Sequence, residues 1–212
     1  MKKDRTWWWV GGIIVLIIVL VVIGKLTSSS GAKGAASTTI ADPSSLPGIQ
    51  TGTTTPWAVE LQNLRARLAA DNLPALAAEG TVLHIHQHLD IFIHGQHVTI
   101  PAGVGIYEAA QFISPIHVHD LTGIIHVESP TPGTFTLGQF FDIWGVKFTN
   151  DCIGGYCNDG TNTLKMYVNG DEYTGDFRTL ELKAHDEIAI TYGTDAEKPA
   201  QIPSSYAFPL GY

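Results

Sequence analysis

The stretch Leu83-His-Ile-His-Gln-His-Leu-Asp-Ile-Phe-Ile-His94 alternates apolar and polar side chains. Successive side chains of a β-strand point to opposite faces, so this alternation predicts a strand with one apolar face for the core and one polar face. Gly95 and Gln96 predict a tight turn after it, from which residues 97–101 return. The polar face of the predicted strand carries four potential metal ligands, which are His84, His86, His88 and Asp90.

A second histidine face is predicted in residues 116–128. Two short alternating runs, Ile-His-Val-His and Ile-Ile-His-Val-Glu, flank the loop Asp-Leu-Thr-Gly, which is the pattern of a β-hairpin. If the runs pair around this loop, His117 lies directly opposite His126, and paired side chains of this kind share a face about 5 Å apart. Glu128 has the same parity as His126, so we expect it to be a ligand, a group that orients a ligand, or a base.

Together these two faces predict a transition-metal site. Eight of the nine histidines lie between His84 and His126, and neutral imidazole is the commonest protein ligand for borderline divalent metals. His84 and His88 are about 13 Å apart along a strand, so the first face either has one spare histidine or contributes to more than one metal position. The second face offers the three-histidine ligand set of carbonic-anhydrase-type zinc sites. The predicted ligands are His84, His86, His88, Asp90, His117, His119, His126 and Glu128.

The donor atoms limit the choice of metal. They are nitrogen and oxygen, and neither Met1 nor Met166 neighbours the histidine segments. This disfavours Cu(I) and suits Cu(II), Zn(II) or Ni(II). Cu(II) has the highest affinity of the three for such ligands, whereas a site with three histidines and an open coordination position is typical of Zn(II). We predict Cu(II) or Zn(II), with a pH-sensing cluster as the alternative, because crowded imidazoles repel one another when protonated near about pH 6. Ordinary hydrogen bonds are expected for the histidines near turns, His94, His97 and His185.

The N-terminal segment predicts a membrane anchor. Residues 7–23 contain no charged residue and follow Lys2, Lys3 and Arg5. At about 1.5 Å per residue they span roughly 26 Å, close to the hydrocarbon thickness of a bilayer. The basic residues favour a cytoplasmic N-terminus, which predicts a single-pass plasma-membrane protein that contacts lipid through residues 7–24 and has its main domain outside the cytoplasm. A cleaved signal peptide is the alternative.

The charge of the chain after residue 26 argues against nucleic acid as a partner. This part has a net charge of −11 and no cluster of lysine and arginine, whereas binding to a phosphate backbone depends on such clusters. An acidic surface attracts metal cations instead. The sequence also has no phosphate-binding loop, nucleotide fingerprint or Ser-His-Asp order that would indicate a common enzyme class.

Composition divides the chain into five parts. Residues 1–26 form the cytoplasmic tip and the anchor, and residues 27–56, rich in Ser, Thr, Gly and Pro, predict a flexible linker. Leucines at helical spacing in residues 57–79 predict an amphipathic helix of about three turns. Residues 80–195 form the histidine-rich β domain, and residues 196–212, with three prolines, an irregular tail.

The second half of the domain contains further local signals. A capping-box pattern at Thr136 predicts a short buried helix that ends near Gly145. The Asn169-Gly170 turn and alternating runs near it predict strands at residues 164–168 and 187–192. Cys152 and Cys157 predict a disulfide, with a metal-binding pair as the less favoured alternative. The predicted fold is mainly β, an antiparallel sheet or sandwich-like domain with short helices behind one transmembrane helix.

Three stretches carry a resemblance to known proteins. They are His84-Ile-His-Gln-His-Leu-Asp-Ile, His117-Val-His-Asp with Ile125-His-Val-Glu-Ser, and Leu137-Gly-Gln-Phe-Phe-Asp-Ile-Trp-Gly-Val. In these motifs the chain resembles a family of uncharacterised, single-pass, extracytoplasmic, histidine-rich proteins of bacteria and archaea, over roughly residues 84–193. The resemblance implies the same membrane topology. It transfers no catalytic residue.

Three functions follow from the sequence as hypotheses. The first is a membrane-anchored extracytoplasmic protein that binds Cu or Zn on its histidine face. The second is a metal-dependent enzyme in which His117, His119 and His126 hold the ion and Glu128 or Asp90 moves protons. The third is a structural subunit of a membrane protein complex. An open metal position beside a concave pocket would favour the enzyme over the binding protein.

Overall fold

The computed structural model of this chain describes residues 40–212, so the predicted anchor at residues 7–24 and most of the predicted linker lie outside the described residues. Between residues 40 and 212, every helix is too short or too polar to cross a bilayer. The described part is mainly β, with mixed sheets and two short α-helices.

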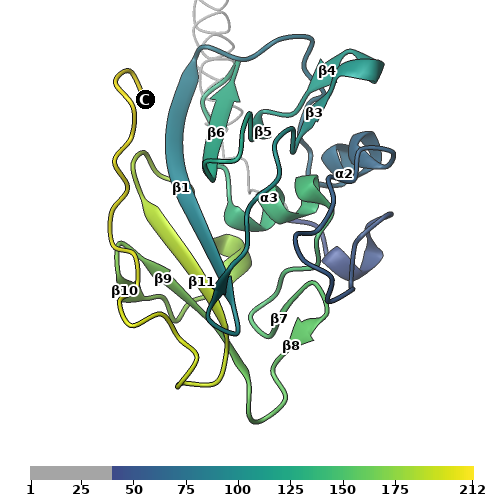
Figure 1. The fold of residues 1–212 in the computed structure, drawn as a ribbon. Helices are drawn as coiled ribbons and strands as arrows, with labels where there is room; N and C mark the ends of the chain where they lie inside the picture. The colour runs from purple at the N-terminus through teal and green to yellow at the C-terminus, as the bar shows by residue number, and fades with distance from the viewer. Residues whose placement is uncertain (1–39) are drawn as a thin grey trace, which may run out of the picture. The chain divides into compact units, whose positions relative to one another are not determined.

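One mixed seven-stranded sheet organises this part of the chain (Figure 1). Its strand order is β10-β9-β11-β1-β6-β5, and β2 pairs with the end of β1. The central pair, β1 and β11, is parallel, and the other pairs are antiparallel. The strands are β1 (Leu83–Ile93), β2 (Gln96–His97), β5 (Ile116–His117), β6 (Ile124–Ser129), β9 (Thr163–Val168), β10 (Asp171–Glu172) and β11 (Glu187–Gly193).

This sheet differs from the antiparallel or sandwich-like arrangement that the sequence predicted. The other sheets of residues 40–212 have two strands each, β3 (Ile106–Tyr107) with β4 (Phe112–Ile113) and β7 (Cys152–Ile153) with β8 (Tyr156–Cys157). Neither can form the second layer of a sandwich. The alternation of apolar and polar residues within a strand indicates which face is buried, but it does not indicate the direction of the neighbouring strand. The parallel pairing of β1 with β11 therefore could not be predicted from either strand's own sequence.

Strand β1 runs through the centre of the sheet and has the two faces predicted for it. Leu89, Ile91 and Ile93 are buried in the core, while the histidines of positions 84, 86 and 88 face the other way. The turn after β1 lies one residue earlier than predicted. His94 and Gly95 both have positive φ angles, 49° and 74°, as a two-residue hairpin turn requires.

Helix α3 (Leu137–Trp144) covers the apolar side of the sheet. Its capping box is present as predicted, because Gln139 N donates to Thr136 Oγ1 and Thr136 N donates to Gln139 Oε1. Gly145 ends the helix with a φ of 81°, a conformation that favours glycine. All eight residues of α3 are buried. The helices α3 and α2 lie on one side of β1 in Figure 1, and the C-terminal tail lies on the other.

Helix α2 (Leu64–Ala70) is shorter than the predicted helix at residues 57–79. Asn72 has a left-handed φ of 55°, and Pro74 follows, so the chain leaves the helix early. The predicted polar face is also interrupted, because Arg67 is fully buried. Its guanidinium donates to the main-chain oxygens of Asp142 and Ile143 at the end of α3, where the helix dipole favours a cation.

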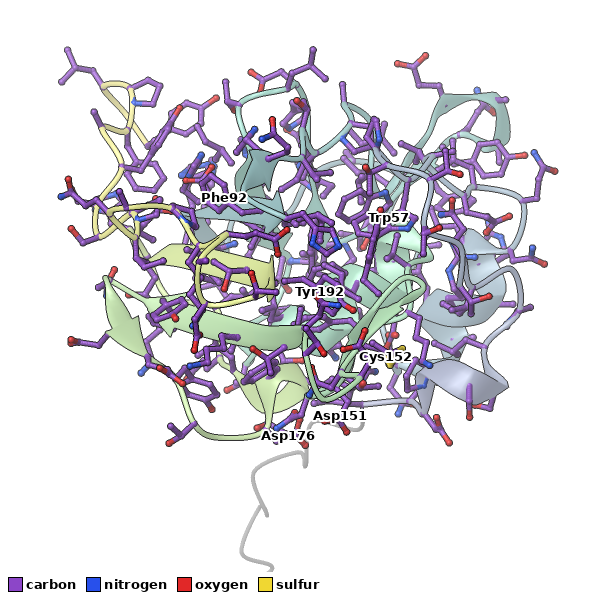
Figure 2. All side chains as sticks on the ribbon, turned by 60° about the horizontal axis from the view of Figure 1, so that its bottom comes forward. Trp57, Phe92, Asp151, Cys152, Asp176 and Tyr192 are labelled. Carbon is purple, nitrogen blue, oxygen red and sulfur yellow. A yellow bond between two sulfur atoms is a disulfide. The ribbon has the colours of Figure 1, made fainter. Side chains whose placement is uncertain are left out.

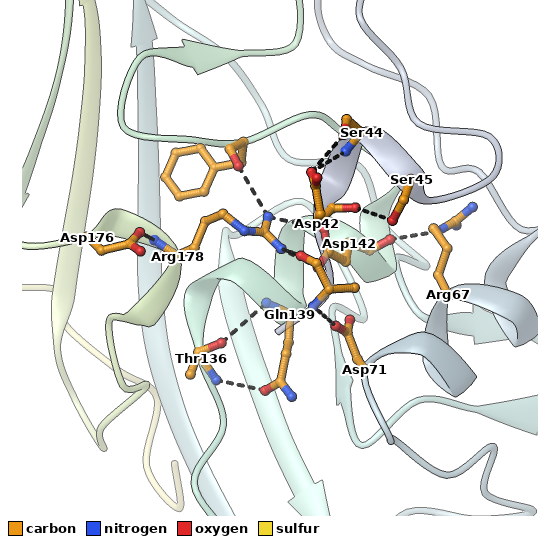
Figure 3. A network of polar contacts seen from close by, with 12 residues as sticks. Asp42, Ser44, Ser45, Arg67, Asp71, Thr136, Gln139, Asp142, Asp176 and Arg178 are labelled. Atoms are coloured by element: carbon orange, nitrogen blue, oxygen red, sulfur yellow. Dashed lines mark hydrogen bonds and ion pairs between the residues drawn. The ribbon is translucent and has the colours of Figure 1, made fainter. Parts of the chain in front are cut away.

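The linker predicted for residues 27–56 extends too far, because its described part packs on the domain. Gln50 N donates to Gly145 O over 2.8 Å. Ala41 N donates to a carboxylate oxygen of Asp71, and Ala41 O accepts from Arg178 (Figure 3). Arg178 also forms a buried ion pair with Asp142, Nη2 to Oδ2 2.6 Å. A composition typical of linkers therefore does not prevent ordered main-chain contacts.

Other local predictions are confirmed. Cys152 and Cys157 form a disulfide across β7 and β8, seen as the yellow bond at the label of Cys152 in Figure 2. Asn169 and Gly170 form the turn between β9 and β10, with φ angles of 54° and 89°. Residues 196–212 contain neither helix nor strand, yet this tail packs over the histidine side of β1.

Candidate metal centre

Three histidines lie in one row across neighbouring strands. In the register of the sheet, His86 of β1 is opposite His126 of β6, and His126 is opposite His117 of β5. The ring centroids of His86 and His126 are 4.5 Å apart, and those of His126 and His117 are 5.3 Å apart. The pairing of His117 with His126 is therefore confirmed. All three side chains are at least nine-tenths buried.

His84 and His119 extend this row at either end. His84 Nε2 is 3.2 Å from His86 Nε2, and His119 Nε2 is 3.0 Å from His117 Nε2. The β5–β6 ladder ends after His117, because Val118 N donates to Val104 O instead. The chain bends there, and His119 turns toward its neighbour. The side chains of His84 and His119 are 50% and 39% exposed, so the row has a buried middle and open ends.

Glu128 lies at the centre of these rings. It is opposite His84 in the register of β1 and β6. Its Oε1 atom is 3.1 Å from His126 Nδ1, 3.3 Å from His84 Nε2 and 3.8 Å from His117 Nε2. Its side chain is only 5% exposed. We use the name histidine centre for this set, which consists of His84, His86, His117, His119, His126 and Glu128.

The spacing of these donor atoms fits metal coordination. A tetrahedral ion with Zn–N bonds of about 2.0–2.1 Å holds its ligand atoms about 3.3–3.4 Å apart. Within the histidine centre, the separations between His84 and His86, between His84 and Glu128, and between His117 and His119 are 3.2, 3.3 and 3.0 Å. Donor atoms of His126 and Glu128 complete two groups in which all donors lie within 4.8 Å. The set can therefore hold a metal ion.

The tautomer of His117 favours ligation. Its Nδ1 atom is 3.0 Å from the main-chain oxygen of Ser114, and an oxygen can only accept, so Nδ1 carries the proton. The Nε2 atom, which faces His119, then has the free lone pair that a metal requires. Metal-binding histidines are commonly oriented by such a bond to a main-chain carbonyl.

The surroundings keep the middle rings neutral. Burial, together with the nearby charge of other histidines, lowers the pKa of His86 and of His117 to about 4 and that of His126 to about 3. Burial also raises the pKa of Glu128. Neutral imidazoles at neutral pH are available as ligands, whereas protonated ones are not.

Glu79 is a neighbour of the histidine centre that the sequence did not indicate. One of its carboxylate oxygens is 3.4 Å from His119 Nε2. It reaches this position because the next residue, Gly80, lies against the end of β6, where a Cβ atom would be 2.1 Å from the main-chain carbon of Ser129. Glu79 belongs to a loop with no periodicity. The one local signal was Gly80 itself, which marks a close approach of two backbones.

His88 and Asp90, both predicted as ligands, lie with Glu187 in a third group, whose donor atoms are within 4.8 Å of one another and could hold a metal ion. His88 Nδ1 is 2.8 Å from Glu187, its partner in the β1–β11 register, and His88 Nε2 is 2.8 Å from Thr122 O. Burial lowers the pKa of His88, but the hydrogen bond and charge of Glu187, with Asp90 and Thr122 O, outweigh it, so the pKa is raised. Both ring nitrogens of His88 thus have an oxygen partner, and neither His88 nor Asp90 belongs to the two donor groups of the histidine centre.

The three remaining histidines each have a partner of their own, as predicted. His94 Nδ1 is 3.1 Å from Glu197, and His97 Nε2 is 2.8 Å from Asp90. His185 Nε2 is 2.9 Å from the main-chain oxygen of Tyr212. These histidines therefore have ordinary hydrogen bonds and do not converge on a common point.

The C-terminal tail covers part of the histidine centre. The ring of Tyr212 lies 4.3 Å from that of His86, between centroids, and 5.4 Å from that of His126. Further back along the tail, Tyr206 stacks on His88 with centroids 3.8 Å apart. These aromatic contacts place an apolar cover beside the ring nitrogens, which limits the approach of water.

Comparisons with protein-family models, curated proteins and solved structures found no match to this chain. Its function is therefore inferred from the residues and geometry of the histidine centre. The resemblance noted in the sequence adds no residue role to that inference.

Proposed function

We propose that this is a membrane-anchored extracytoplasmic protein that binds a transition-metal ion, Cu(II) or Zn(II), in its histidine centre. The observation that carries the proposal is the convergence of ring nitrogens from three adjacent strands and one loop, at separations of 3.0–3.2 Å within each pair. A shared ion requires several donor atoms at such separations, and burial keeps these rings neutral and able to bind it. The anchor and the location rest on the uncharged residues 7–23 and the basic residues before them.

The donor set supports the choice of metal. Both cysteines are in the disulfide, so neither supplies a thiolate, and Met166 is buried in the apolar core. Imidazole with carboxylate suits Cu(II) and Zn(II) and does not suit Cu(I). Metal affinity should fall as the pH drops toward about 4, because protons then compete for the ring nitrogens of His86 and His117.

A second candidate function is a metal-dependent enzyme, and one observation favours it. A groove of about 470 Å³ adjoins His119, at one of the two partly exposed ends of the histidine centre, and is lined by Val59, Leu61, Ile106, Tyr107 and Glu108 among others. A substrate in this groove would reach a metal bound by His117, His119 and His126, and Glu128 could exchange protons there.

Metal analysis tests the first proposal. The full chain is purified in detergent without a histidine tag, dialysed against Zn(II) or Cu(II), and measured by elemental analysis. We expect stoichiometric metal in the wild type and loss of most of it when His117, His119 and His126 are replaced by Ala. The matched control is His94→Asn with His97→Asn, which removes two histidines outside the centre. Equal metal content in wild type and triple variant would contradict the proposal.

Anion binding separates the binding protein from the enzyme. In a Co(II)-substituted protein, an exchangeable coordination position lets azide bind and changes the visible spectrum. A clear spectral change would favour the enzyme. An unchanged spectrum at saturating azide would favour a closed site for storage or delivery.

A further inference from the structure

We propose that the histidine centre is a binuclear site, in which two transition-metal ions share Glu128 as a bridging ligand. This rests on the proposed function, because it specifies how the same residues bind metal. The starting observation is that the donors form two groups. One contains His84 and His86, the other contains His117 and His119, and both contain His126 and Glu128.

The two outer pairs are equivalent in geometry. Each consists of histidines two residues apart, with Nε2 atoms at 3.2 Å in His84–His86 and at 3.0 Å in His117–His119. In each pair one ring is buried and the other is partly exposed. A bound ion at either pair would therefore have a buried ligand, a surface ligand and a route to solvent.

A single ion is too small to use both pairs. Ligand atoms on opposite sides of one ion, at bonds of about 2.0–2.1 Å, are at most about 4.2 Å apart. The six donors of the centre fall into two groups at a limit of 4.8 Å, and no group contains both outer pairs. One ion would leave one of the two outer histidine pairs without a bound metal. Two ions use both pairs.

Glu128 is placed to join the two positions. Its Oε1 atom is 3.3 Å from His84 Nε2, in the first pair, and 3.8 Å from His117 Nε2, in the second. A carboxylate has two oxygens and can give one to each ion. The ring of His126 is equally central, with its centroid 4.5 Å from those of both His86 and His119.

The charges near the second pair also suit an additional cation. Glu79 is 3.4 Å from His119 Nε2, so a second carboxylate is available on that side. No Lys or Arg side chain of residues 40–212 forms an ion pair with Glu79 or Glu128. Two divalent ions would therefore find two carboxylates that lack a protein cation, apart from the histidines themselves.

Copper provides the probe for this proposal, because a carboxylate bridge couples the electron spins of two Cu(II) ions. The full chain in detergent is titrated with Cu(II) at about pH 7.5, where imidazole is neutral, and followed by elemental analysis and EPR. We expect two copper ions per chain, with an integrated EPR intensity far below that of two independent ions.

Two variants that replace a partly exposed histidine test the proposal without disturbing the buried part of the fold. His84→Ala and His119→Ala each remove a partly exposed ring, and each should lose one copper and regain the full EPR intensity of the other. His97→Asn should behave as wild type. Glu128→Gln should also restore full intensity, because an amide does not bridge the ions.

The outcomes separate this proposal from the proposed function. One copper per chain in the wild type, or two with full EPR intensity, would overturn the binuclear site and leave metal binding intact. No copper bound by the histidine centre would overturn both.

Discussion

His117 and His126 stack on each other from neighbouring strands, with ring centroids 5.3 Å apart and planes at 14°. Both rings are buried, and stacked imidazoles in such a place can be stable only while neutral. The β5–β6 register, which places them opposite each other, thus defines the chemistry available here. The rings of His117 and His126 offer lone pairs at neutral pH and resist protonation.

The metal-free protein should lose stability in acid. The folded-state pKa values of His86, His117 and His126 are about 4, 4 and 3, below about 6.5 in an unfolded chain. Their contribution to the free energy of unfolding is complete above about pH 6.5 and is lost as the pH falls toward the folded values. We expect about 6 kcal/mol less stability at pH 5 than at pH 7.5, about 2 kcal/mol for each histidine, measured by urea unfolding with a chelator present. Unchanged stability between these pH values would contradict the lowered pKa values.

Metal should stabilise the fold. A ligand that binds only the native state adds about 2.7 kcal/mol at a concentration of 100 Kd. We expect Zn(II) to raise the unfolding temperature of the wild type and a chelator to reverse it. His126→Asn, which removes the central ring, should abolish most of this rise. An equal rise in His126→Asn would mean that Zn(II) binds elsewhere.

Asp71 should destabilise the protein at high pH. Burial, with the nearby Asp142 carboxylate, raises the pKa of Asp71 to about 7. Its favourable protonated form is lost as the pH rises from about 4 through 7, so stability falls over that window. Asp71→Asn keeps an acceptor for Ala41 N without the charge. It should stabilise the protein more at pH 8 than at pH 5, by about 2–3 kcal/mol. Thermal unfolding of both proteins at the two pH values measures this difference.

Arg178 should be more important for stability than a surface arginine. It forms a buried ion pair with Asp142 and donates to Phe148 O. Arg178→Met leaves the Asp142 charge without its partner and should cost about 3–5 kcal/mol, whereas Arg178→Met with Asp142→Leu should cost clearly less. Urea unfolding of the two variants gives the comparison. Arg65→Met, on the exposed side of α2, is the control. An equal cost in the single and double variants would show that the charge is not the cause.

The C-terminal tail should slow metal exchange. Tyr212 lies against His86, and Tyr206 against His88. Deleting residues 206–212 should speed the removal of metal by a chelator several-fold without changing how much metal binds. Leu210→Ala is the control, since Leu210 is fully exposed. An unchanged rate after deletion would show that the tail does not restrict access.

Local signals predicted the elements that depend on neighbours in sequence. The alternation in β1, the capping box at Thr136 and the Asn169-Gly170 turn are each determined within a few residues. The pairing of His117 with His126 was predictable for the same reason, because a short hairpin fixes its own register. Most of the histidine centre followed from these local rules.

Features that depend on distant residues were not predictable. The parallel pairing of β1 with β11 joins His88 to Glu187 and so places His88 in a donor group separate from the histidine centre. Burial of Arg67 depends on the end of α3. Glu79 reaches His119 through a close approach of backbones that the composition of its loop does not indicate. In each case tertiary contact overrides the local pattern.

The central claim is that the histidine centre binds metal, and an anomalous diffraction map of crystals grown with Zn(II) tests it most directly. We predict an anomalous peak about 2.0–2.1 Å from ring nitrogens of the centre, one beside His117 and His119 and, in the binuclear form, a second beside His84 and His86. Ordered rings with no peak among them would contradict the claim.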